Sequence, residues 1–91
     1  MSDCGYFDDA PPDHVNADGV KWWVHWSLTG HATSETLGIG KPLTGAKVFI
    51  AQRPDGFREY VLTRNGKYIA ADSALEGIGA QIDMARLAEA I

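Results

Sequence analysis

The sequence predicts an α+β domain, namely a four-stranded antiparallel meander with one C-terminal helix packed on one face. Apolar residues alternate with period two over residues 20–29, and turn sequences separate further strand-like runs between residues 46 and 71. A stripe of apolar residues with helical spacing begins after residue 73. The 91 residues suffice for one domain. We therefore expect an N-terminal leader over residues 1–19 and a single domain over residues 20–91.

The leader is expected to be acidic and flexible. Residues 1–20 contain five Asp and no Lys or Arg, whereas the rest of the chain carries eight basic and seven acidic side chains. Pro11-Pro12 and Asp18-Gly19 disfavour regular structure. The leader could be a solvated tail, or an arm that contacts a basic partner. It could also fold back over the domain through Tyr6, Phe7 and Val15.

The first strand is expected over residues 20–29. In this strand Trp22 shares one face with Val24, while Trp23 and His25 lie on the other face. Residues 30–45 are rich in Gly and Thr and are expected to form a loop. The Gly-x-Gly-Lys sequence in this loop lacks the remaining residues of a phosphate-binding loop, so we expect no phosphate site there.

Two tight turns are expected to connect the next three strands. Asn65-Gly66 favours a two-residue type I′ turn, which needs positive φ at both residues and would pair Leu62 with Ile69. Pro54-Asp55-Gly56 favours a three-residue loop with Gly56 in the left-handed position.

The three-residue loop sets the expected register of the sheet. It pairs Val48 with Leu62 and Ile50 with Tyr60, and it places Ile69 and Ala71 on the same buried face. The opposite face would carry Lys47, Phe49, Ala51, Arg53, Phe57, Glu59, Val61, Thr63, Tyr68 and Ala70. This second set is less polar than a face that only meets solvent.

The C-terminal helix is expected to begin near Ser73. Ser73 and Glu76 have the spacing of a capping box, and Asp72 adds negative charge at the positive end of the helix. The apolar stripe that would pack on the sheet consists of Leu75, Ile78, Ile82 and Ala85. A second apolar patch lies further around the helix and either packs within the domain or mediates self-association; it comprises Met84, Leu87 and Ile91.

No residue pattern indicates catalysis, a metal site or a cofactor. Cys4 and the three His residues lack the clustered spacing of a zinc site, and the single Cys excludes an intrachain disulfide. No nucleophile-elbow motif occurs. No apolar run approaches the roughly 18–20 residues of a membrane span, and the N-terminus lacks a signal-peptide pattern. We therefore expect a cytoplasmic protein that is not an enzyme and does not bind a membrane.

The face of the sheet opposite the helix is the expected binding surface. Its aromatic and basic side chains fit a protein-binding patch, or a platform on which the bases of a single-stranded nucleic acid stack. Alternatively, the leader could cover this face. The expected partner-binding residues are Trp23, His25, Phe49, Arg53 and Tyr68.

Residues 57–91 resemble small phage and prophage accessory proteins. The similar features are two strands joined by Asn65-Gly66-Lys67, followed by a helix that starts at Ser73-Ala-Leu-Glu76. Some of these proteins are anti-CRISPR proteins and other inhibitors of host defence. The resemblance implies a small non-catalytic protein that occupies a surface on a protein or ribonucleoprotein complex, such as a CRISPR effector, in the host cytoplasm. A single-stranded nucleic-acid binder and a phage structural or assembly subunit are the alternatives.

Overall fold

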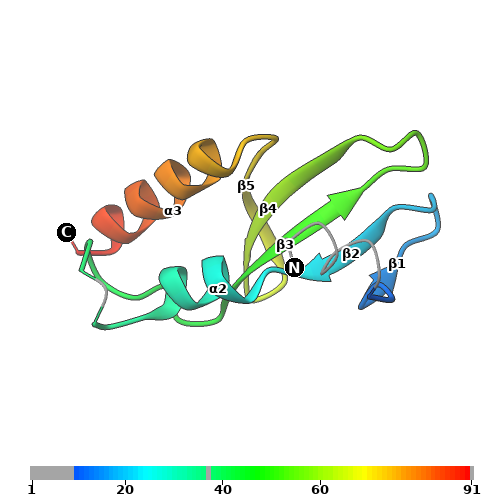
Figure 1. Cartoon of the computed structure of the whole chain (residues 1–91). Helices are drawn as coiled ribbons and strands as arrows, with labels where there is room; N and C mark the ends of the chain where they lie inside the picture. Colours follow the sequence, from blue (N-terminus) through cyan, green and yellow to red (C-terminus); the bar gives the residue numbers. More distant parts are fainter. Residues whose placement is uncertain (1–9, 37, 91) are drawn as a thin grey trace.

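The computed structural model describes residues 10–36 and 38–90, and these form one antiparallel sheet with two helices (Figure 1). The sheet has five strands in the order β1-β2-β3-β4-β5. The α+β class is confirmed, but the sheet has one more strand than expected and a second helix accompanies the C-terminal one. The elements are β1 (His14–Val15), β2 (Lys21–Val24), α2 (Trp26–Thr33), β3 (Ala46–Gln52), β4 (Arg58–Arg64), β5 (Lys67–Asp72) and α3 (Leu75–Ala90).

Part of the expected leader belongs to the sheet. β1 pairs with β2 through His14 opposite Trp22, and the Asp13 amide donates to the Trp22 carbonyl at 2.8 Å. The turn between the two strands is held by the side chain of Asn16, whose Oδ1 accepts hydrogen bonds from the amides of Asp18 and Val20, both at 3.0 Å. The acidic residues of positions 1–9, with Tyr6 and Phe7, lie outside the described residues.

The expected strand over residues 20–29 is wrong in its second half, because β2 ends at Val24 and α2 begins at Trp26. His25 is the N-cap of α2, and its Nδ1 accepts a hydrogen bond from the Leu28 amide at 3.2 Å. The Thr29 hydroxyl then accepts from the Val48 amide at 2.9 Å, as a neighbouring strand would. Tertiary contact with β3 therefore overrides the alternating pattern of this segment. The expected loop over residues 30–45 is likewise helical up to Thr33.

The hairpin between β3 and β4 has the expected three-residue turn. Gly56 has a φ of +95°, its amide donates to the Arg53 carbonyl at 2.8 Å, and the Arg53 amide donates to the Phe57 carbonyl at 2.8 Å. The predicted register is confirmed, with Val48 opposite Leu62. The type I′ prediction for the next turn is also consistent with the structure, since both of its central residues have positive φ.

A β-bulge in β5 overturns the predicted register beyond this second turn. Thr63 lies opposite Tyr68, but Leu62 lies opposite Ala70, so Ile69 is an extra residue that is 40% exposed. Ala70 therefore moves to the helix-covered face, Ala71 moves to the other face, and neither matches the prediction. The bulge also turns Asp72 towards α3, where its Oδ1 accepts from the Ala74 amide at 2.8 Å.

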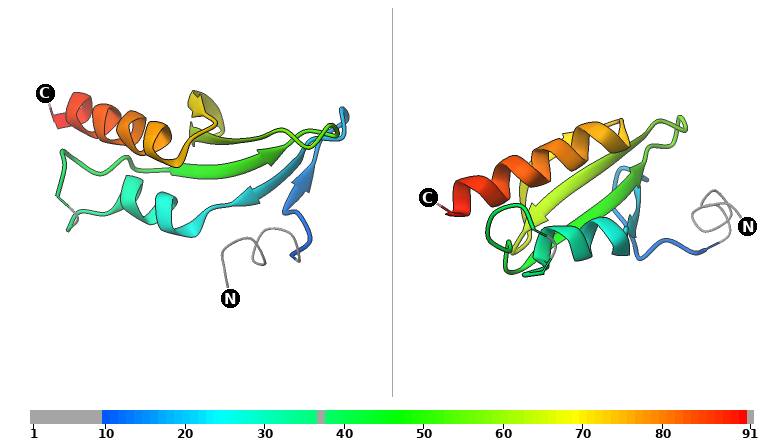
Figure 2. Two further views of the ribbon diagram at one scale, coloured as in Figure 1. Left: turned by 45° about the horizontal axis from the view of Figure 1, so that its top comes forward. Right: turned by 60° about the vertical axis from the view of Figure 1, so that its left-hand side comes forward.

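Both helices pack on one face of the sheet, with α3 over β4 and β5 and α2 along β3 (Figure 2). Leu75, expected in the packed stripe, is the first residue of α3 and is 52% exposed, whereas Ile78 and Ile82 are fully buried. The core beneath the helices consists of Ala32, Leu43, Ala46, Val48, Leu62, Ile78 and Ile82, with Leu28, Tyr60 and Ala85 at its border.

The fully buried side chain of Arg86 on α3 fastens the end of α2 and the following loop. Its guanidinium donates to the carbonyls of His31, Ser34 and Gly40. These carbonyls include the end of α2, where the helix dipole favours a cation. His31 also contacts Asp83 of α3, with 2.6 Å between Nε2 and Oδ1. The two helices are therefore joined by polar contacts as well as by the core.

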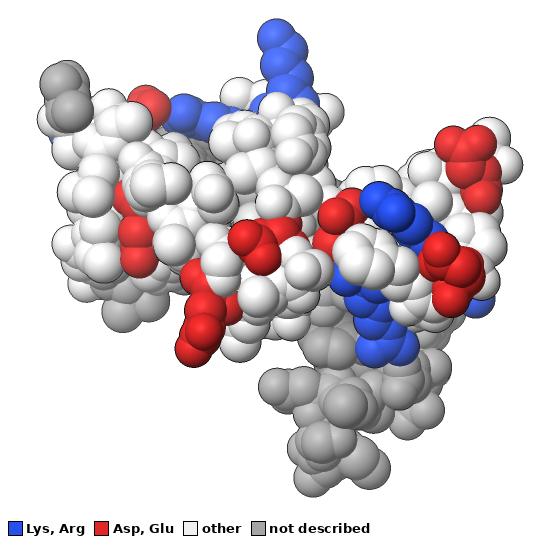
Figure 3. All heavy atoms as spheres, turned by 90° about the horizontal axis from the view of Figure 1, so that it is seen from above, with Lys and Arg blue, Asp and Glu red and all other residues white. Residues whose placement is uncertain are grey.

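Most of the surface seen from above in Figure 3 is uncharged, and acidic and basic side chains are scattered over it, some of them side by side. Uncharged side chains on the outer side of α3 include Met84 and Leu87, which are 55% and 52% exposed. Ile91, the third member of the expected self-association patch, lies outside the described residues. Within the described residues, no helix is both long and apolar enough to cross a membrane.

Candidate docking face of the sheet

The face of the sheet opposite the helices, which we call the open face, carries Trp22 and not Trp23. Trp22 lies opposite Ala51 and next to Phe49, whereas Trp23 lies opposite Ile50 on the helix-covered face. Trp23 is 8% exposed, and its indole Nε1 donates to the Ala10 carbonyl at 2.9 Å. The predicted placement of Trp23 beside Phe49 is therefore wrong. Along β3, β4 and β5, the open face includes Lys47, Phe49, Thr63 and Tyr68.

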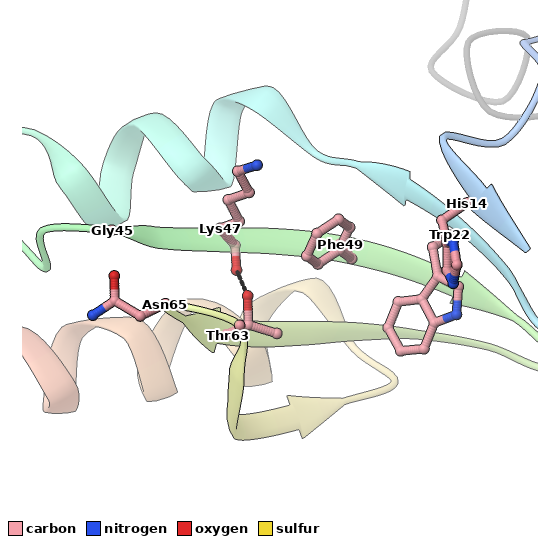
Figure 4. Close-up of a pocket in the computed structure, with 8 residues that line it drawn as sticks. His14, Trp22, Gly45, Lys47, Phe49, Thr63 and Asn65 are labelled. Carbon is pink, nitrogen blue, oxygen red and sulfur yellow. Dashed lines mark hydrogen bonds between the residues drawn. The ribbon is translucent and has the colours of Figure 1, made fainter. Parts of the chain in front are cut away.

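A hollow of about 460 Å³ lies on the open face (Figure 4). The rings of Trp22 and Phe49 meet edge to face at one end, with centroids 5.8 Å apart and planes at 90°. Such a pair presents a rigid apolar wall. The Thr63 hydroxyl donates to the Lys47 carbonyl at 3.2 Å, so a side-chain hydrogen bond links β4 to β3 at the floor of the hollow. The described residues that line it are His14, Trp22, Gly45, Lys47, Phe49, Thr63, Asn65 and Gly66.

Gly45 and Asn65 fix the other end of the hollow. The Asn65 amide donates to the Gly45 carbonyl at 3.1 Å, which ties the residues before β3 to the turn between β4 and β5. Gly45 has a φ of +83°, and a Cβ at this position would collide with the Asn65 side chain. Only glycine fits both the backbone conformation and the close approach.

A second hollow, of about 470 Å³, adjoins the first at Asn65. It lies around the start of β5, where the Tyr68 side chain is 68% exposed. Arg64 and Lys67 lie opposite each other and alternate with Thr63 and Tyr68, so their side chains lie on the helix-covered side of the sheet. Its lining is Arg64, Asn65, Lys67, Tyr68 and Ile69.

Arg64 in the second hollow is held by Glu89 of α3. The Arg64 Nη1 donates to Glu89 Oε2 at 2.9 Å, and Nη2 lies 3.4 Å from Oε1. These hydrogen bonds lower the pKa of the Glu89 carboxyl, with a further contribution from the positive charge of Arg64. The same hydrogen bond raises the pKa of Arg64. The Arg64 Nε also donates to the Thr44 carbonyl at 3.1 Å, so the guanidinium is held in one orientation.

In the part of the chain that the structure describes, Lys and Arg are the only residues of fixed charge in the two linings. Among residues 10–36 and 38–90, Lys47 lines the first hollow, Arg64 and Lys67 line the second, and no Asp or Glu lines either one. Glu59 of the open face lies towards the other end of β4, where it is 3.8 Å from Arg53. Among the described residues, Lys47 therefore gives the first hollow a positive charge, whereas Glu89 compensates the charge of Arg64 in the second.

The structure brings Phe49 and Tyr68, two of the five predicted binding residues, onto the open face. His25 instead caps α2, and its ring meets that of Tyr60 with 5.9 Å between centroids. Arg53 lies at the tip of the β3–β4 hairpin, where its guanidinium stacks over Phe57 at 4.7 Å.

Sequence reasoning missed several residues around the two hollows. The alternating pattern of residues 20–24 would have predicted Trp22 on the open face if the other side of the strand had been assigned to the core. His14 could not be found this way, since the short pairing of β1 leaves little pattern in the sequence. The missed residues are His14, Trp22, Gly45, Asn65 and Gly66.

Within residues 10–36 and 38–90, no group of three or more His, Cys, Asp or Glu side chains is placed to hold a metal ion. In comparisons with protein-family models, curated proteins and solved structures, no match to this chain is found.

Proposed function

We propose that this chain is a small binding protein that docks on a protein partner through the open face of its sheet. The observation that supports this most directly is the hollow whose wall is the Trp22–Phe49 ring pair. The described helices both pack on the other side of the sheet, so they leave this wall accessible. Aromatic side chains that line a concave surface are typical of the residues that contribute most to protein–protein binding.

The lining favours binding without catalysis. The Thr63 hydroxyl is engaged by the Lys47 carbonyl, and the Asn65 backbone is engaged by Gly45. These contacts shape the floor of the hollow, and they do not place a nucleophile beside a base. We therefore propose that the chain acts by occupying a surface of its partner.

The resemblance to phage accessory proteins gives this proposal a concrete form. In that form the partner is a CRISPR effector complex in the host cytoplasm, and the chain inhibits it. A single-stranded nucleic-acid binder is a second candidate, because Tyr68 is 68% exposed beside Lys67 and could stack on a base.

The experiment is retention of purified CRISPR effector complexes on the immobilised full chain, together with an interference assay in cells. Phe49→Ala is expected to weaken retention about tenfold, which is the loss typical of an interface hot spot. Phe57→Ala is the matched control, because Phe57 is 43% exposed at the hairpin tip and lines neither hollow. It is expected to bind as the wild type does.

The anti-CRISPR form is overturned if no effector is retained and interference is unaffected. Docking through the open face is overturned if an effector is retained and Phe49→Ala weakens it no more than Phe57→Ala does. Circular dichroism of both variants separates lost binding from lost folding.

A further inference from the structure

The first hollow of the open face places a single cation beside the aromatic wall. Lys47 and Phe49 are two residues apart on β3, so their side chains leave the same face of the sheet, about 6–7 Å apart along the strand (Figure 4). Trp22 lies on the neighbouring strand, and its ring meets that of Phe49 with 5.8 Å between the centroids. One ammonium group and two rings therefore line the same hollow on the same face.

The charge of Lys47 is available to a ligand. Among the described residues, Lys47 forms no ion pair, its side chain is exposed, and no Asp or Glu lines the hollow. Glu59 also lies on the open face, but it is 3.8 Å from Arg53, which compensates its charge. The hollow therefore attracts a group that carries one negative charge, and its described lining holds no anion that would attract a positive one.

The size and the lining of this hollow are those of a small-ligand site. Its volume of about 460 Å³ lies within the range of about 300–1,000 Å³ that is usual for such sites, which combine an apolar wall with a few polar groups. The aromatic wall bounds one end, and Gly45 and Asn65 bound the other, where the Asn65 amide donates to the Gly45 carbonyl at 3.1 Å. The Thr63 hydroxyl already donates to the Lys47 carbonyl, so the ammonium of Lys47 is the charged donor of the site.

From this arrangement we infer that the hollow binds a small aromatic carboxylate. The ring of the ligand packs on Trp22 and Phe49 in the edge-to-face or offset geometry that aromatic groups prefer, and its carboxylate accepts hydrogen bonds from the Lys47 ammonium. This site needs no protein partner, so the inference goes beyond the proposed docking. Because the bound ligand covers the same aromatic wall, it would also compete with a docked protein.

Other charged aromatic ligands fit this hollow less well. An aromatic amine, or the ammonium group of a free amino acid, would lie near Lys47 with no carboxylate of the described lining to pair with it. A strand of nucleic acid carries one charge for each phosphate and needs several cations along its path, whereas the hollow holds one lysine. The ligand class is therefore an uncharged ring with one acidic group.

The test is a titration of the ¹⁵N-labelled full chain at neutral pH, followed by amide shifts and by calorimetry. The main probe is indole-3-propionate, whose short side chain can bridge the spacing between Phe49 and Lys47. The comparison probes are tryptamine, which has the same ring with an ammonium group, and hexanoate, which has the carboxylate without a ring. Indole-3-propionate is expected to bind most tightly, with saturable shifts at Phe49, Thr63 and Asn65, and its affinity should fall with added salt.

Two variants assign the parts of the ligand to the parts of the hollow. Lys47→Gln is expected to weaken binding of indole-3-propionate about threefold, since it removes one solvent-exposed ion pair, and it should not weaken binding of tryptamine. Lys21→Gln is the matched control, because Lys21 is also exposed on a strand but does not line the hollow, and it should leave the affinity unchanged. Phe49→Leu removes a ring contact and should weaken both indole probes by about threefold or more.

Several results would overturn the inference. Tighter binding of tryptamine than of indole-3-propionate contradicts the anionic group, and equal binding of hexanoate contradicts the ring. Equal losses in Lys47→Gln and Lys21→Gln contradict the role of Lys47. If no probe gives saturable shifts at Phe49 or Thr63, the hollow is not a ligand site. None of these results decides on docking, which the effector experiment with Phe49→Ala tests separately.

Discussion

At the scale of single residues, Arg86 connects α3 to the end of α2 and to the loop that follows it. Its guanidinium is fully buried and donates to the carbonyls of His31, Ser34 and Gly40. Arg86→Met keeps much of the volume but leaves these carbonyls without their donor. We expect a loss of about 3 kcal/mol in the free energy of unfolding, as for other broken buried polar networks. Urea denaturation measures it.

Arg58→Met provides the control for this prediction. Arg58 is exposed on β4, and its Nε donates to Gln52 Oε1 at 3.0 Å on the surface. Its removal should change stability by no more than about 0.5 kcal/mol. Equal losses in the two variants would show that the Arg86 carbonyl contacts contribute little.

The Arg64–Glu89 pair predicts a dependence of stability on pH. The hydrogen bond from Arg64 lowers the pKa of Glu89 in the folded chain. The unfolded state therefore takes up a proton at higher pH than the folded state does, and the pair stabilises the fold above the usual pKa of the carboxyl, 4.5. This stabilisation is lost as the pH falls through the lower, folded value.

The measurement compares the wild type with Glu89→Gln by urea denaturation from neutral pH down to about pH 3. The wild type should be more stable at neutral pH, and the difference should vanish at the acidic end. Because the Arg64 and Glu89 side chains are in part exposed to solvent, added salt should also reduce the difference. A difference that is constant over this pH range would contradict the assignment to Glu89.

At the level of elements, the loop after α2 depends on glycine at position 40. Gly40 has a φ of +69°, and a Cβ there would collide with the backbone of Arg86. Gly38 has a φ of +49° but has open space around it, so it is a matched control. Gly40→Ala should lower the melting temperature clearly more than Gly38→Ala, whose cost is only the backbone strain of about 1 kcal/mol. Similar melting temperatures would show that the loop can move away from α3.

The β3–β4 hairpin shows which part of the fold the sequence can predict. Its turn, Pro54-Asp55-Gly56, fixes how the strands enter and leave, so the register Val48–Leu62 follows from local residues. The bulge at Ile69 could not be predicted, since it depends on how Asp72 meets α3. The helix over residues 26–33 was missed for a similar reason. The Thr29 hydroxyl accepts a hydrogen bond from the Val48 amide of β3, and this contact exists only in the folded chain.

The candidate site could be predicted as a face but not as a set of residues. The alternation within β3 and the Asn65-Gly66 turn placed Phe49 and Tyr68 on the side away from α3. The face of Trp22 was not fixed, because a helix and a long connection separate β2 from β3. A slip of one residue between these strands exchanges Trp22 and Trp23, which is the error that occurred.

At the scale of the whole molecule, self-association through the exposed apolar residues of α3 stays a prediction. Met84 and Leu87 are 55% and 52% exposed, so they do not complete the core of the described chain. If two copies pair through α3, sedimentation should show a dimer that dissociates on dilution, and Met84→Glu should abolish it. Leu75→Glu, at an equally exposed position, is the control. A monomer at all concentrations would show that the patch has no such role.

The two borders of the sheet bear on how the protein behaves at high concentration. β1 is two residues long, and β5 is interrupted by the bulge at Ile69, so neither offers a long straight row of backbone groups to another chain. Fibril growth by strand addition would therefore begin poorly at either border. Deleting Ile69 would straighten β5, and it should shorten the lag before thioflavin-positive aggregates form.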